Sequence, residues 1–128
     1  MSIEQQLIDL TQQLLESIAG GDWETYARLC DLSLTAFEPE SSGQLVPGLM
    51  FHKYFFDLDR AKTPQNTTMC APHVRMLGSD SAVVSYVRLN QLLDSSGAPV
   101  VRRYEETRVW QRQQGEWKHV HFHRSVSV

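Results

Sequence analysis

Three arginines in the second half of the sequence, Arg88, Arg108 and Arg124, belong to segments in which apolar and polar residues alternate. A β-strand sends alternate side chains to opposite faces, so each arginine shares a face with aromatic or aliphatic residues, as Arg124 does with Phe122. If these are the concave faces of a sheet, the three guanidinium groups converge in one cavity. Guanidinium binds carboxylate through paired hydrogen bonds, so the pattern favours an anion-binding site.

Buried positive charges are costly unless they are paired. Glu106 shares the face of Arg108 and is one expected partner, and Glu38 and Glu40 are others. Any positive charge left over would make the cavity attractive to anions. The alternative is that the arginines extend outward from the rim of the sheet with their charged ends in water.

The segment that ends in Arg124 also carries a ladder of histidines. His119, His121 and His123 alternate along residues 119–124, which places them on the face opposite Arg124. Three histidines on one face could bind a metal ion, but the nearby sequence offers no acidic or cysteine ligand. Histidines at the surface or at a subunit contact are the favoured interpretation, and no metal site is predicted.

Signals of catalysis are weak. Tyr26, His52 and Glu106 could supply an acid/base pair, and Glu38 is the only candidate for a deep general base with a histidine partner. The sequence contains no phosphate-binding glycine loop, nucleophile elbow or zinc signature. We therefore predict no enzyme activity and no cofactor.

The composition is that of one ordinary globular domain spanning residues 1–128, with 41% hydrophobic and 21% charged residues. A net charge of −3 and a pI of about 5.9 give no basic surface for nucleic acid or acidic lipid.

Cys30 and Cys70 lack a metal or redox spacing, and we expect free thiols in a reducing compartment. With no secretory signal and no apolar run of about 20 residues, a cytoplasmic location without membrane contact is predicted.

Helices are expected before strands along the chain. Apolar spacings of three and four predict a long helix over residues 2–19, capped by Ser2 and stopped at Gly20–Gly21. Shorter helices follow at 23–30, after the N-cap Asp22, and at 47–60, with a short strand at 32–38 between them. Long strands at 66–77, 81–93, 99–111 and 116–125 are separated by turn signals. This order predicts an α+β fold in which a curved antiparallel sheet covers helices.

The strand at 81–93 has a second apolar face, opposite Arg88. Val83, Val87, Leu89 and Leu93 lie on it, and Val109 lies on the corresponding face of the next strand. An antiparallel sheet that faces water should be polar on its outer side, and exposed apolar patches of this kind mark interfaces. We expect a second copy of the chain to cover these residues. The alternative is a loop or the third helix.

Several motifs resemble the association (hub) domain of calcium/calmodulin-dependent protein kinase II, and they occur in order over nearly the whole chain. They are Gly-Asp-Trp-Glu-Thr-Tyr at 21–26, Leu-Thr-Ala-Phe-Glu-Pro-Glu at 34–40, Phe-His-Lys-Tyr-Phe-Phe at 51–56, Tyr-Val-Arg-Leu at 86–89, Glu-Glu-Thr-Arg-Val-Trp at 105–110 and Val-His-Phe-His-Arg-Ser at 120–125. The second, fifth and last of these motifs are the most specific.

The resemblance implies a cone-shaped nuclear-transport-factor-2-like (cystatin-like) fold, with the long N-terminal helix packed in a strongly curved antiparallel sheet. It also implies a homo-oligomer in which dimers close into two stacked rings. The cavity of the family contains three arginines, which match Arg88, Arg108 and Arg124, together with a histidine and a tyrosine that match His52 and Tyr26. That cavity accepts small carboxylates and a peptide-like segment, so a peptide or a kinase hub in trans is a further expected partner.

The chain also departs from the kinase. No kinase domain or calmodulin-binding segment precedes Met1, so we expect either a stand-alone hub protein, which the Met-Ser start favours, or an excised hub. Residues 57–71 differ from the kinase hub and are shorter, which could alter the ring. The leading hypothesis is a non-catalytic oligomerisation hub with a carboxylate pocket. The alternatives are a small-molecule binding module and, by analogy of fold alone, a small enzyme.

Overall fold

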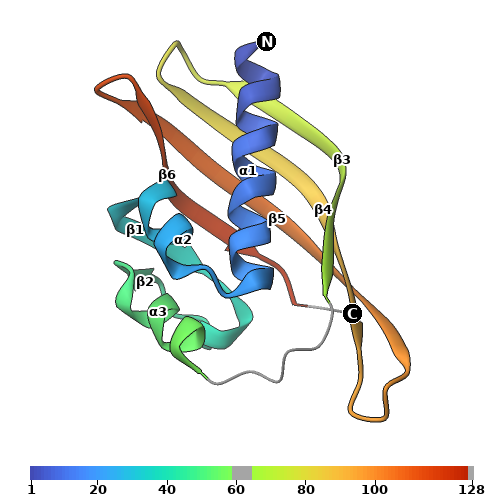
Figure 1. Cartoon of the computed structure of the whole chain (residues 1–128). Helices are drawn as coiled ribbons and strands as arrows, with labels where there is room; N and C mark the ends of the chain where they lie inside the picture. The colour runs from blue at the N-terminus through green and yellow to red at the C-terminus, as the bar shows by residue number, and fades with distance from the viewer. Residues whose placement is uncertain (59–64, 127–128) are drawn as a thin grey trace.

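The computed structural model describes residues 1–58 and 65–126, in which a long helix lies across the concave face of a curved sheet (Figure 1). The sheet has six strands in the order β2-β1-β6-β5-β4-β3. The helices are α1 (Ile3–Gly20), α2 (Trp23–Leu29) and α3 (Met50–Asp57), with a 3-10 turn η1 (Pro39–Ser41). The strands are β1 (Cys30–Phe37), β2 (Val46–Pro47), β3 (Asn66–Met76), β4 (Ser81–Leu93), β5 (Pro99–Gln113) and β6 (Glu116–Arg124). The α+β fold with a long N-terminal helix is as predicted.

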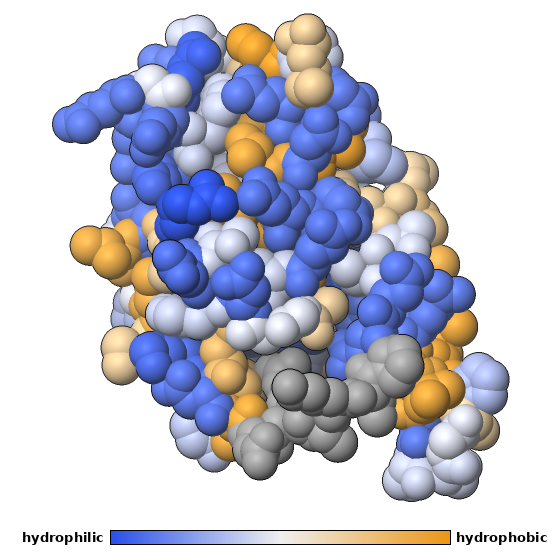
Figure 2. All heavy atoms as spheres, in the orientation of Figure 1, coloured by the Kyte–Doolittle hydropathy of each residue, from blue (hydrophilic) through white to orange (hydrophobic). Residues whose placement is uncertain are grey.

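Helix α1 begins and ends where its sequence signals place it. The Ser2 side chain accepts a hydrogen bond from the Gln5 backbone N–H, and Gly21 closes the helix with a left-handed φ of 69°. Thr11 lies fully buried at the middle of the helix, where its hydroxyl accepts a hydrogen bond of 3.1 Å from the Trp110 indole. This contact fixes the helix against β5. The outward side of α1 belongs to a mainly hydrophilic face of the molecule (Figure 2).

The four long strands form the predicted antiparallel meander, but the other edge of the sheet differs from expectation. Strand β1 pairs with β6 in parallel, and β2 pairs with β1. The third helix was predicted to begin at Pro47. Pro47 instead belongs to β2, and the chain turns at Gly48, with φ of 79°, before α3 begins. The predicted end of this helix, at Arg60, lies outside the described residues.

The register of β4 and β5 is unbroken from Ser81 opposite Gln111 to Leu93 opposite Pro99. Burial alternates over residues 81–88 of β4 and 104–110 of β5, and Tyr86, Arg88, Glu106 and Arg108 are all buried on the concave face with the aliphatic core, as the period of two predicted.

Strand β6 does not keep that alternation, because it contains a β-bulge. Val109 pairs with His121, whereas the next residue, Trp110, pairs with His119. Val120 is thus an extra residue, and it turns His119 to the concave side. The prediction that His119, His121 and His123 share the outer face is wrong for His119, which is 0% exposed.

No helix of the described residues is long and apolar enough to cross a membrane. Cys30 and Cys70 are both free, and Cys30 is buried.

Candidate functional site

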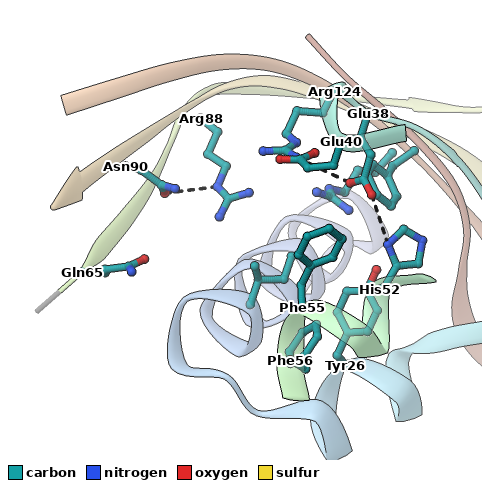
Figure 3. Close-up of a pocket in the computed structure, with 13 residues that line it drawn as sticks. Tyr26, Glu38, Glu40, His52, Phe55, Phe56, Gln65, Arg88, Asn90 and Arg124 are labelled. Carbon is teal, nitrogen blue, oxygen red and sulfur yellow. Dashed lines mark hydrogen bonds and ion pairs between the residues drawn. The ribbon is translucent and has the colours of Figure 1, made fainter. Parts of the chain in front are cut away.

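A cavity of about 210 Å³ lies between the concave face of the sheet and the two short helices (Figure 3). Five of the six residues predicted for the anion pocket line it: Tyr26 from α2, His52 from α3, and Arg88, Arg108 and Arg124 from the sheet. The alternation of the strands brings the arginines to one face, and the short helices close the end of the cone. Aromatic rings from Phe55, Phe56 and Phe122 complete the wall.

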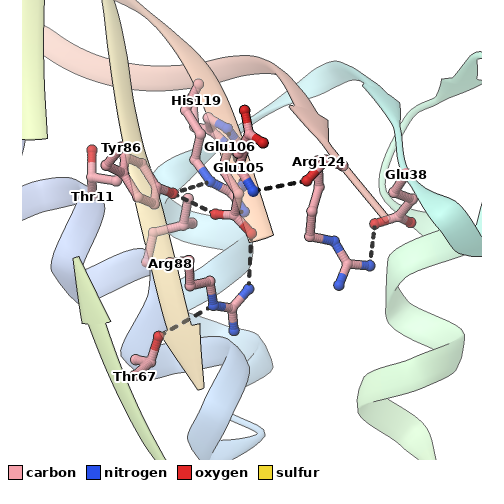
Figure 4. A network of polar contacts seen from close by, with 12 residues as sticks. Thr11, Glu38, Thr67, Tyr86, Arg88, Glu105, Glu106, His119 and Arg124 are labelled. Carbon is pink, nitrogen blue, oxygen red and sulfur yellow. Dashed lines mark hydrogen bonds and ion pairs between the residues drawn. The ribbon is translucent and has the colours of Figure 1, made fainter. Parts of the chain in front are cut away.

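Glu106, the sixth predicted residue, lies behind the cavity wall and is 2% exposed. Its carboxylate accepts hydrogen bonds from Arg88 Nη1 at 3.2 Å, Arg108 Nη2 at 3.1 Å and the Tyr86 hydroxyl at 2.5 Å (Figure 4). Arg108 Nε donates to the Tyr86 oxygen at 2.9 Å. One carboxylate therefore holds two of the three arginines in place.

The electrostatics of this network keep Glu106 ionised. Burial by itself raises the pKa of Glu106, but the guanidinium groups of Arg108 and then Arg88 lower it to about 2. Burial likewise opposes the charge of Arg108, while Tyr86 and Glu106 raise the pKa of this arginine above its ordinary value. The pair is thus charged at neutral pH.

Arg124 has different partners at the mouth of the cavity. Its Nη2 forms an ion pair with Glu40 and lies 3.6 Å from Glu38 Oε2, and its Cζ lies 4.9 Å from the centre of the Tyr104 ring. The three arginines therefore face three carboxylates, which are those of Glu38, Glu40 and Glu106. Within the described part of the chain the charges of the arginines are balanced, so anion binding by these residues must depend on N–H donors that point into the cavity.

His52 carries an unused polar atom into the site. Its Nδ1 lies 3.4 Å from Glu38 Oε1, and its Nε2 is buried without a hydrogen-bond partner among the described residues. An unsatisfied buried polar atom costs about 1–3 kcal/mol. The cost is removed if a ligand or water in the cavity bonds to this nitrogen.

Tyr26 packs at the floor of the cavity and is 2% exposed. Its ring centre lies 6.2 Å from that of His52 and 5.0 Å from that of Phe56. Burial, and then the neighbouring Cys30, raise the pKa of the Tyr26 hydroxyl well above its usual value. Tyr26 is therefore a neutral hydrogen-bonding group in this site.

Sequence reasoning missed His119, which lies under Arg108. Burial and then the charge of Arg108 hold the pKa of His119 well below its usual value, so its ring is neutral. The alternation rule could not find it, because the bulge at Val120 has no glycine to mark it.

The predicted interface residues lie on the convex face of the sheet. Val83 and Val109 are cross-strand neighbours there, and they are half-buried, as are Val87 and Leu89. Leu93, near the end of the hairpin, is 37% exposed. Helix α3 lies on the concave side, where His52 reaches the cavity, so it does not cover these residues (Figure 1).

A curved sheet that closes with helices around a cavity is the architecture of the nuclear-transport-factor-2-like fold. A solved nuclear-transport-factor-2-like protein of Cytophaga hutchinsonii superposes with a TM-score of 0.78 at 20% identity, covering 98% of this chain and 99% of that one. At this identity the likeness shows the fold alone.

Residues 3–128 match the family described as calcium/calmodulin dependent protein kinase II association domain, and the chain belongs to that family. It is 49% identical to the Chlamydomonas reinhardtii calcium/calmodulin-dependent protein kinase II hub homology domain, with a TM-score of 0.94 and 98% of each chain covered. It is 48% identical to the delta subunit of calcium/calmodulin-dependent protein kinase type II from Oryctolagus cuniculus, over 97% of this chain. The match spans 24% of that kinase subunit.

Proposed function

We propose that residues 1–128 form one oligomerisation domain, which assembles through its convex sheet face into a closed double ring of dimers. The observation that carries this proposal is the partly buried apolar strip around the Val83–Val109 pair, on a sheet face that no helix of the described residues covers. A face of this kind favours a second copy. Identical copies that meet through unlike surfaces must close into a ring or grow into a filament. The family resemblance favours closure.

We also propose that the concave cavity binds a small carboxylate. Arg88 Nη2 and Arg124 Nη1 have no hydrogen-bond partner among the described residues, and both arginines line the cavity. In this proposal the domain acts in the cytoplasm and has neither enzyme activity nor a cofactor. A kinase hub or a peptide segment of another protein is a further candidate partner.

Native mass spectrometry at micromolar concentration tests the assembly. The expected result is one species with the mass of an even number of chains, larger than a tetramer. A monomer, or an isolated dimer at that concentration, would exclude the ring. Light scattering over a dilution series is the independent check, because a closed ring resists dissociation while an open filament changes its mass with concentration.

Isothermal calorimetry with sodium acetate tests the cavity. The Arg108→Ala change should abolish binding, but it also leaves Glu106 with a buried, uncompensated charge, so we choose R124Q as the main variant. A charge-assisted hydrogen bond contributes about 1.5–3 kcal/mol, and R124Q should therefore weaken acetate at least about tenfold. The control is R103Q, since Arg103 forms an exposed ion pair with Glu105. Equal affinities for R124Q and R103Q would contradict the site.

A further inference from the structure

His119 is a buried polar residue for which the proposed function has no role. It is 0% exposed and does not line the cavity. Its ring lies between two aromatic neighbours, 5.3 Å from the centre of Trp110 and 5.6 Å from that of Phe122, with the latter tilted by 19°. The bulge at Val120 places it there, next to the guanidinium of Arg108.

The two ring nitrogens of His119 contact two different groups. Nε2 lies 3.5 Å from Nη1 of Arg108, and Nδ1 lies 3.5 Å from Sγ of Cys30. A guanidinium can only donate, so Nε2 is the unprotonated acceptor and Nδ1 carries the hydrogen that faces the sulfur. These contacts connect Arg108, which lines the cavity, to the buried thiol of Cys30.

Arg108 is held on several sides by its neighbours. Its Nε donates to Tyr86, its Nη2 to Glu106 and its Nη1 to His119. The Phe122 ring centre lies 4.4 Å from Cζ and covers one face of the guanidinium. Arginine has five N–H donors, so two have no acceptor among the described residues and are available to a ligand. Their direction is fixed only while all three protein acceptors hold the group.

We propose that His119 is a positioning residue for the carboxylate site, which holds the guanidinium of Arg108 so that its two remaining N–H groups point into the cavity. This inference rests on the proposed carboxylate binding. A group fixed before the ligand arrives loses less conformational freedom on binding, which raises affinity without a new contact. Cys30 positions His119 in turn, because its sulfur accepts the Nδ1 hydrogen and so keeps Nε2 free to accept from Arg108.

The test is calorimetry with sodium acetate on two variants, H119L and H119Q. Leucine fills the buried site without an acceptor, whereas glutamine keeps an oxygen near the position of Nε2. One hydrogen bond contributes about 1 kcal/mol, so H119L should raise the Kd for acetate about fivefold to tenfold. H119Q should restore the Kd to within about twofold of the unsubstituted chain. The melting temperature of H119L should fall, because the buried Nη1 of Arg108 loses its acceptor, and H119Q should recover most of the loss.

An unchanged Kd in H119L overturns the proposal, and so do equal losses in H119L and H119Q, because ring shape and not the acceptor would then matter. If the unsubstituted chain does not bind acetate, the carboxylate function fails on its own. A crystal structure of H119L then decides the role of His119. A displaced Arg108 guanidinium supports a positioning role, and an unmoved one overturns it.

Discussion

Replacing Glu106 with glutamine is expected to lower the free energy of unfolding by about 3–5 kcal/mol. The carboxylate accepts hydrogen bonds from Arg88, Arg108 and Tyr86 in a site that is 2% exposed. Glutamine keeps the size of the side chain but removes the charge, so two buried guanidinium groups lose their counter-charge. Urea unfolding followed by circular dichroism measures the loss. Both proteins are compared at one concentration, because assembly makes stability concentration-dependent.

The matched control is Glu105→Gln, at the adjacent position on the opposite face of β5. Glu105 is exposed, and its ion pair with Arg103, at 3.5 Å, is exposed too. Pairs of this kind contribute about 0–1 kcal/mol. If E106Q and E105Q lose the same stability, the buried ion pairs do not hold the cavity wall.

The same carboxylate makes stability depend on pH. Burial opposes ionisation, but Arg108 and Arg88 lower the pKa of Glu106 from 4.5 to about 2 in the folded chain. A lowered pKa gives stability that is complete above about pH 4.5 and is lost as the pH falls through 2. The loss is on the order of 3 kcal/mol, since each pKa unit corresponds to about 1.4 kcal/mol. Urea midpoints measured from pH 6 downward should fall more steeply for the unsubstituted chain than for E106Q, and parallel curves would contradict the assignment.

The concave face of β4 and β5 could be predicted from sequence because nothing interrupts the pairing of these strands. With an unbroken register, the period of two alone brings Arg88, Glu106 and Arg108 together. Tyr26 and His52 could be placed only through family resemblance. Both lie on short helices, whose orientation depends on long-range packing that no local spacing records.

Two features of the site depend on pairings that the sequence does not show. Arg124 forms its ion pair with Glu40, which is 84 residues away and reaches it because β1 lies beside β6 in parallel. Glu38 and Glu40 could be named as candidate partners. The sequence did not show, however, that three carboxylates would neutralise all three arginines of the cavity. The bulge at Val120 likewise reversed the side assigned to His119. The parallel pairing of β1 with β6 and the bulge in β6 therefore determine which groups contact the arginines, and the alternation of side chains along a strand does not predict either feature.

The convex face leads to the second large expected effect. Val109→Asp should reduce the assembly to monomers or small oligomers while the chain stays folded. Val109 is half-buried opposite Val83, with His121 as its neighbour on β6. A carboxylate placed in an apolar interface without a partner costs several kcal/mol, and the cost recurs at every copy of the interface in a symmetric particle.

Native mass spectrometry at pH 8 measures the loss of assembly, and circular dichroism at the same pH checks that the chain stays folded. At that pH His121 is neutral, because burial lowers its pKa below the usual value, so it cannot neutralise the new aspartate. The control Gln6→Asp adds the same charge to an exposed position of α1, and its particle mass should not change. If V109D keeps the mass of the unsubstituted particle, the Val83–Val109 strip lies outside the subunit contact. If both variants dissociate, added charge and not the location of Val109 controls assembly.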